Sequence, residues 1–140
     1  MPVASIRAVR SSRPKVTQPP SLRPVELARY FQAKLAAEWG PHDLKRALEE
    51  QKDQIFLLDV RDRGGFQQGQ IPGAKNIPLK ELESRLKELP KDQEIVTYCW
   101  NVTCSLCTRA ALLLAEKGFR VRELVGGIAE WQSAGFPTQK

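Results

Sequence analysis

The chain of 140 residues has no apolar run near the ~18–20 residues that a membrane-spanning helix needs. It contains one histidine and three cysteines, and all three cysteines fall within nine consecutive positions. A disulfide framework would need an even number of cysteines scattered along the chain. With 41% apolar and 27% charged residues, the composition is typical of a soluble globular protein. We therefore expect one cytoplasmic domain with thiol chemistry at a single place.

Acidic residues are absent from the first 23 positions, and this absence accounts for the basic character of the chain. Those positions hold five basic residues, whereas the remaining 117 hold 17 basic and 16 acidic ones, so the formal net charge of +6 belongs mainly to the tail. Because the body has no basic stripe, nucleic-acid binding is not expected. Residues 1–23 are predicted to be a flexible basic tail. Their arginines and serines also suit an organelle-targeting segment.

The rest of the chain alternates segments with helix and strand patterns. Helices are expected at 24–39, 42–51, 79–89, 105–117 and 128–133, and strands at 55–60, 74–77, 94–98 and 121–124. Several glycines and a proline between Gly64 and Gly73 predict a loop with tight turns. Strands that alternate with helices indicate an α/β fold with a central, mostly parallel β-sheet. The predicted organisation is a tail over 1–23, an N-terminal helix over 24–39 and a domain over 40–140.

The place of Cys99 in this pattern makes it a candidate reactive residue. It follows the strand expected at 94–98, and ligand sites in open α/β sheets form beyond the carboxyl ends of the strands. A thiol there faces the amino end of the next helix, whose partial positive charge favours the thiolate. The loop that follows can present backbone N–H groups to an anion; it consists of Trp100, Asn101, Val102, Thr103, Cys104 and Ser105. On position alone, a small buried apolar residue is an equally good interpretation of Cys99.

Two groups of motifs resemble those of the rhodanese, or sulfurtransferase, family. The first group is Leu57-Leu58-Asp59-Val60-Arg61, Phe66, Gly69-Gln70-Ile71-Pro72-Gly73-Ala74 and Asn76-Ile77-Pro78-Leu79. The second group is Tyr98-Cys99, Ala110-Ala111, Gly118-Phe119, Leu124-Val125-Gly126-Gly127 and Trp131. The motifs occur in the family's order over about 41–137. The family's fold is a small α/β domain with a parallel sheet, as the pattern above also indicates.

The resemblance implies that Cys99 is the nucleophile of a thiosulfate sulfurtransferase that needs no metal and no organic cofactor. Its thiolate would attack the outer sulfur of a small anionic donor such as thiosulfate, release sulfite and hold the sulfur as a persulfide. The sulfur would then pass to cyanide, a thiol or a protein acceptor. This sequence departs from the family's pattern at three places: the loop 100–104 lacks a glycine, Gln70 replaces a common histidine and Gly65 replaces a common acid.

The other two cysteines, Cys104 and Cys107, have several interpretations. Cys104 is a candidate resolving thiol, which would attack the persulfide or form a disulfide with Cys99. Cys107 is expected to be a small buried residue in the first turn of the helix at 105–117. A redox pair of Cys104 and Cys107 is an alternative, whereas the spacing does not support a zinc site completed by His42.

Charged residues near the expected site have structural interpretations as well. Asp59 and Arg61 end a strand and are expected to form an ion pair that holds loops together near the site. Arg109 either binds sulfonate oxygens or lies on the solvated face of its helix. Two rival functions stay open: a non-catalytic rhodanese-fold module that binds a protein partner, and a thiol redox protein that uses Cys104 and Cys107.

Overall fold

The structure is a computed structural model that describes residues 21–140. The chain divides into two compact units, Met1–Gln32 and Ala33–Lys140. Most of the tail predicted over 1–23 lies outside the described residues. Helix α2 (Pro24–Ala37) begins after Arg23, whose backbone N–H donates to Glu26 Oε2 at 2.8 Å. It ends two residues earlier than the helix predicted over 24–39.

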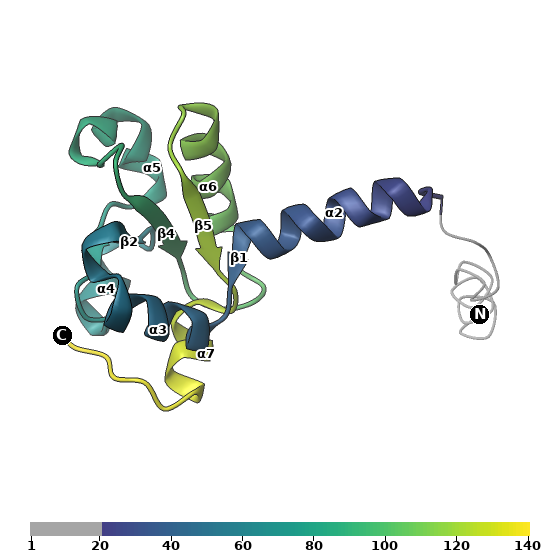
Figure 1. Ribbon diagram of the computed structural model, residues 1–140. Coiled ribbons are helices and arrows are strands. Elements are labelled where there is room, and N and C mark those ends of the chain that lie inside the picture. The colour runs from purple at the N-terminus through teal and green to yellow at the C-terminus, as the bar shows by residue number, and fades with distance from the viewer. Residues whose placement is uncertain (1–20) are drawn as a thin grey trace, which may run out of the picture. The chain divides into compact units, whose positions relative to one another are not determined.

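The unit Ala33–Lys140 contains a five-stranded parallel sheet in the order β1-β5-β4-β2-β3 (Figure 1). The strands are β1 (Glu38–Trp39), β2 (Ile55–Asp59), β3 (Lys75–Asn76), β4 (Glu94–Tyr98) and β5 (Val121–Leu124). The α/β fold with a parallel sheet is thereby confirmed. Glu38 and Trp39 were predicted as the end of a helix, but they pair with β5 as an edge strand. The order places β4 between β5 and β2, at the centre of the sheet.

The helices of this unit are α3 (Pro41–Glu50), α4 (Arg63–Gln68), α5 (Leu79–Leu82), α6 (Leu106–Glu116) and α7 (Gly127–Ser133). Two 3₁₀ helices lie at Lys52–Gln54 and Glu83–Glu88. The prediction of a loop between Gly64 and Gly73 was wrong for residues 64–68, because they belong to α4. Asp62 caps α4 by accepting a hydrogen bond from the N–H of Gly65 at 2.8 Å. The helix predicted over 79–89 is also broken, since Arg85 leaves helical geometry (φ −121°, ψ 20°).

Each face of the sheet is covered by its own hydrophobic core. Helices α5 and α6 lie on one face of the sheet, and α3 and α7 lie on the other (Figure 1). Leu82 and Leu114 belong to the first core, and Leu44 and Trp131 belong to the second. Side chains alternate between the two faces along a strand. Ile95 therefore faces α6, Val96 and Tyr98 face the opposite core, and Cys99 returns to the α6 side. This alternation determines which helix the thiol of Cys99 meets.

A buried ion pair joins the loops at the carboxyl end of β2. Arg61 Nη2 lies 2.6 Å from Asp59 Oδ2, and the two side chains are 2% and 0% exposed. The same Nη2 donates to the carbonyl oxygen of Gly69 at 2.7 Å. Asn76 donates to the carbonyl oxygens of both Asp59 and Arg61, at 3.0 and 2.9 Å. The ion pair thus joins the end of β2 to the segment after α4, and Asn76 joins β3 to the same place.

Replacing Asp59 by asparagine keeps the shape of the side chain but leaves the Arg61 charge buried without a counterion. We expect Asp59→Asn to lower the free energy of unfolding by roughly 3–5 kcal/mol. The exposed pair Arg63–Glu81, at 2.7 Å, supplies the control, because Arg63→Gln should cost at most about 1 kcal/mol. Urea denaturation of both variants measures the difference. Equal losses of unfolding free energy in the two variants would show that the buried pair stabilises the fold no more than the exposed pair does.

Candidate functional site

Cys99 follows the last residue of the central strand β4, and its backbone is fixed by α7. The N–H of Ile128 donates to the carbonyl oxygen of Cys99 at 3.0 Å, and the N–H of Ala129 donates to the carbonyl oxygen of Trp100 at 3.0 Å. Gly127 has a φ of +58°, and a Cβ there would collide with the Cys99 carbonyl. The start of α7 therefore needs a glycine at this position, and its N–H groups hold the Cys99 backbone in place.

The thiol of Cys99 is completely buried and lies among sulfur and oxygen atoms of α6 and the preceding loop. Its Sγ is 3.4 Å from Cys107 Sγ and 3.6 Å from the carbonyl oxygen of Cys104. When protonated, the Cys99 thiol can donate to this carbonyl. When ionised, its sulfur can accept a hydrogen bond from the thiol of Cys107.

These contacts favour the ionised form of Cys99. A hydrogen bond from the Cys107 thiol lowers the pKa of Cys99 to about 6, against the effect of burial, and Cys104 and the backbone at Cys107 and Trp100 contribute in the same direction. The same contact raises the pKa of Cys107, together with burial and the charge of Glu123. Burial raises the pKa of Cys104. At neutral pH the negative charge of the cluster therefore belongs to Cys99.

Cys107 lies in the first turn of α6 and is held against Cys99 from two sides. Thr97 of β4 is buried, and its hydroxyl donates to the Cys107 carbonyl oxygen at 3.0 Å. Glu123 Oε2 lies 3.9 Å from Cys107 Sγ and accepts a 2.6 Å hydrogen bond from the hydroxyl of Thr108. The sequence analysis expected Cys107 to be a buried residue or the redox partner of Cys104, and not a partner of Cys99. A cysteine directly after a strand together with one in the first turn of the next helix is the signal that it overlooked.

In the predicted substrate-binding loop, residues 100–105, some backbone N–H groups form hydrogen bonds within the loop. Asn101 Oδ1 accepts hydrogen bonds from the N–H and the hydroxyl of Thr103, at 3.1 and 2.8 Å. The N–H of Cys104 donates to the carbonyl oxygen of Asn101 at 3.1 Å. Val102 and Ser105 are exposed. The expectation that successive N–H groups face an anion is thus incorrect for Thr103 and Cys104 in this conformation.

Trp100 connects the loop to the buried ion pair. Its ring lies over the guanidinium of Arg61, with 4.6 Å between the guanidinium carbon and the ring centroid. The absent side chain of Gly65 makes room for it, because a Cβ at Gly65 would lie 2.5 Å from Trp100 Cζ2. Trp100 therefore occupies the space that a side chain at position 65 would fill.

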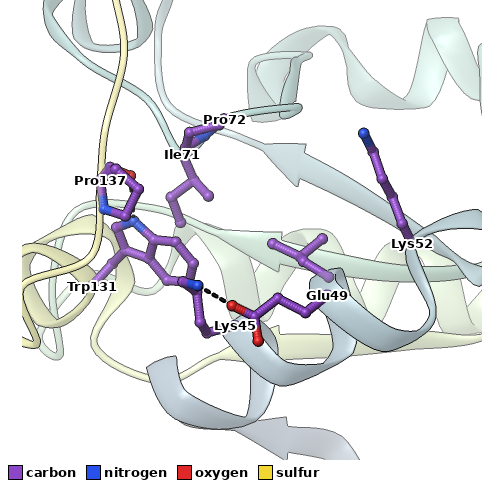
Figure 2. Close-up of a pocket in the computed structure, with 8 residues that line it drawn as sticks. Lys45, Glu49, Lys52, Ile71, Pro72, Trp131 and Pro137 are labelled. Atoms are coloured by element: carbon purple, nitrogen blue, oxygen red, sulfur yellow. Dashed lines mark hydrogen bonds and ion pairs between the residues drawn. The ribbon is translucent and has the colours of Figure 1, made fainter.

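Two surface hollows are relevant to the location of the site. One, of about 290 Å³, borders the loop and is lined by Arg61, Gly69, Trp100 and Asn101 among others. Another, of about 220 Å³, lies between α3 and α7, with Ile71, Pro72, Trp131 and Pro137 at its apolar wall and Lys45, Glu49 and Lys52 at its rim (Figure 2). Cys99 lines neither hollow, but its neighbours Trp100 and Asn101 line the first.

The other candidates from the sequence do not join the site. His42 is exposed and packs edge-on against Phe136, with 5.1 Å between the ring centroids. Arg109 is exposed on α6. Over residues 21–140, no group of three or more His, Cys, Asp or Glu side chains is arranged to hold a metal ion. The same residues form no helix that is long and apolar enough to cross a membrane.

Comparisons with known proteins agree on one family. The family described as "Rhodanese-like domain" matches residues 40–134. A "Sulfurtransferase" of Allochromatium vinosum is 35% identical over 101 residues, which cover 71% of this chain and 92% of that protein. The crystal structure of the BH2092 protein from Bacillus halodurans has a TM-score of 0.77 at 36% identity, over 84% of this chain and 86% of that one.

A further relative shows that such a domain also occurs within longer proteins. The "HTH-type transcriptional regulator Rv0324" of Mycobacterium tuberculosis is 40% identical over 87 residues, or 62% of this chain. The match spans only 38% of the regulator. The similarity is therefore to one part of that protein.

The fit between Gly65 and Trp100 yields a test with a neighbouring control. Gly65→Ala should displace the Trp100 ring from Arg61, change the tryptophan fluorescence and cost about 1–3 kcal/mol of stability. Gly64→Ala, in the same helix, meets only Asp62 Oδ1 at 3.9 Å. It should be neutral or stabilise by up to about 1 kcal/mol. Removing the ring in a Gly65→Ala/Trp100→Ala double variant should recover part of the loss, and strict additivity would refute the contact.

Proposed function

This chain belongs to the rhodanese-like domain family, and we propose that it is a sulfurtransferase in which Cys99 takes a sulfane sulfur from a donor such as thiosulfate. The observation that carries the proposal is the hydrogen bond from Cys107, at 3.4 Å between the sulfur atoms, which lowers the pKa of Cys99 to about 6. The thiolate is the nucleophilic form of cysteine. Cys99 is therefore ionised at neutral pH without a metal or an organic cofactor.

The proposed reaction has two displacement steps at sulfur. The Cys99 thiolate attacks the outer sulfur of thiosulfate, the S–S bond of thiosulfate breaks, and sulfite leaves with the electron pair. The product is a persulfide on Cys99. Cyanide or a thiolate then attacks the outer sulfur of this persulfide and leaves as thiocyanate or a new persulfide, which regenerates the Cys99 thiolate.

The buried position of Cys99 requires that the loop 100–105 moves when the donor binds. Val102 is 74% exposed, and Trp100 is 39% exposed. The hollow of about 290 Å³ adjoins the loop at Trp100 and Asn101 and contains Arg61 in its wall. We place the entry of the anionic donor at this hollow, with residues Trp100 to Ser105 as the binding loop. Asp59 and Arg61 support this loop through the contact of Arg61 with Trp100.

The reaction can be followed by the products of thiosulfate and cyanide. The native chain should release sulfite and form thiocyanate, whereas Cys99→Ser should lose at least ~100-fold in turnover, since no other thiolate is present at neutral pH. An unchanged melting temperature of Cys99→Ser shows that the loss is chemical. A chain that folds but forms neither product from thiosulfate would instead be a binding module or use another donor. Mercaptopyruvate and glutathione persulfide then test the second of these outcomes.

The pH dependence of sulfite release tests the role of Cys107. A lowered pKa means that the reactive thiolate is present above about pH 6 and is lost below it, so the rate should rise through pH 6 and then stay level. Cys107→Ala removes the hydrogen-bond donor and should move this rise toward pH 8–9, about 100-fold in acidity. Cys107→Ser keeps a donor and should keep most of the shift. Identical profiles for all three chains would refute the contribution of Cys107.

A further inference from the structure

The proximity of two cysteine thiols extends the chemistry of the site beyond sulfur transfer. Building on the proposed function, we propose that Cys107 is a resolving thiol. Without an acceptor, it attacks the Cys99 persulfide, forms a Cys99–Cys107 disulfide and releases hydrosulfide. The domain would then alternate between a sulfur carrier and a closed, oxidised state that accepts no further sulfur until a thiol reduces it.

The geometry needs only a small movement for this bond to form. The two sulfur atoms are 3.4 Å apart, and the S–S bond of a disulfide is about 2.0 Å long. Both side chains are buried in the same hydrophobic core. The hydroxyl of Thr97 fixes the first turn of α6 to β4 through the carbonyl oxygen of Cys107. Cys107 is therefore held beside the inner sulfur of the persulfide, which is Cys99 Sγ.

Cys104, which the sequence suggested as the resolving thiol, is less well suited to this role. Its carbonyl oxygen lies 3.6 Å from Cys99 Sγ, and its thiol also hydrogen-bonds to Cys99 but lowers the pKa of Cys99 less than the Cys107 thiol does. Cys104 belongs to the loop that has to move when a donor binds, whereas Cys107 lies in α6. A thiol on the rigid helix keeps its distance to Cys99 when the loop opens, so Cys107 is the better partner for an intramolecular disulfide.

The step balances without an external oxidant, because thiosulfate has already supplied the sulfane sulfur. The negatively charged outer sulfur of the persulfide first takes the proton of the Cys107 thiol, and Cys107 becomes the thiolate that the attack needs. This thiolate attacks Cys99 Sγ, the bond from Cys99 Sγ to the outer sulfur breaks, and the outer sulfur leaves with the electron pair as HS⁻. Until then the contact with Cys99, burial and the charge of Glu123, whose Oε2 lies 3.9 Å from Cys107 Sγ, raise the pKa of Cys107 and keep it protonated. The sulfane sulfur is reduced and the two cysteines are oxidised.

The experiment uses thiosulfate without cyanide or added thiol, under anaerobic conditions. The native chain should release one sulfite and one sulfide per chain and then stop, and peptide mapping should show a disulfide between Cys99 and Cys107. Cys107→Ser should release sulfite but no sulfide and should keep a mass gain of about 32 Da, one sulfur atom, on Cys99. Cys104→Ser tests the other pairing: whatever its rate of sulfite release, it should release as much sulfide per sulfite as the native chain and should form the Cys99–Cys107 disulfide.

Other results would overturn the assignment of Cys107. A stable persulfide on the native chain, sulfide release by Cys107→Ser, or a mapped Cys99–Cys104 disulfide would each refute it while leaving sulfur transfer intact. If thiosulfate releases no sulfite from any chain, the proposed use of thiosulfate as the donor has failed. The diazene oxidant diamide then tests the thiol pair alone, because it takes two electrons and two protons from the two thiols. A Cys99–Cys107 disulfide after diamide supports the pairing, and its absence refutes it.

Discussion

The contact between the sulfur atoms of Cys99 and Cys107 is the interaction on which the proposed chemistry of this domain depends. It follows from the backbone, because alternation along β4 turns Cys99 toward α6, and Thr97 anchors the first turn of α6 to the same strand. The contact places a thiol donor where many anion sites rely on backbone N–H groups and the helix dipole. The backbone at Trp100 and Cys107 still contributes to the low pKa of Cys99, but the side chain of Cys107 has the largest lowering effect.

A second group of contacts supports the loop that covers the thiol. The ion pair of Asp59 and Arg61 is buried at the same edge of the sheet, and Trp100 lies over Arg61 where Gly65 leaves room. The loop is thereby attached to the sheet at Trp100, directly after Cys99. Hydrogen bonds to Asn101 fix the middle of the loop. In the proposed reaction, the Cys99 thiolate is covered at rest and becomes accessible when these few residues move.

The sequence predicted the features that depend on buried, continuous patterns. The strands at 94–98 and 121–124 have the predicted bounds: the first is a mostly buried run at the centre of the sheet, and the second lies between the turns at Gly118 and at Gly126 and Gly127. Cys99 could be located for the same reason. Helix α4, which Asp62 caps, could not be predicted, because Gly64 and Gly65 are typical of a loop. The two-residue edge strand β1 could not be predicted either, because it forms only by pairing with β5.

The pairing of Cys99 with Cys107 was also beyond the sequence pattern. Eight positions separate the two cysteines, and only the path of the loop 100–105 decides how closely the thiols of Cys104 and Cys107 approach the sulfur of Cys99. The hydrogen bonds of Asn101 within the loop were equally hidden. Local patterns predict where a strand ends, whereas contacts across a loop depend on the tertiary structure.

The ionisation of Cys99 can be measured directly by ¹³C NMR of the chain labelled at the cysteine Cβ atoms, titrated from acid to alkaline pH. We predict that the Cys99 signal changes with a midpoint at about pH 6, while those of Cys104 and Cys107 stay in the thiol form well above it. A midpoint for Cys99 near the ordinary value of about 8.5, or ionisation of Cys107 before Cys99, would contradict the account.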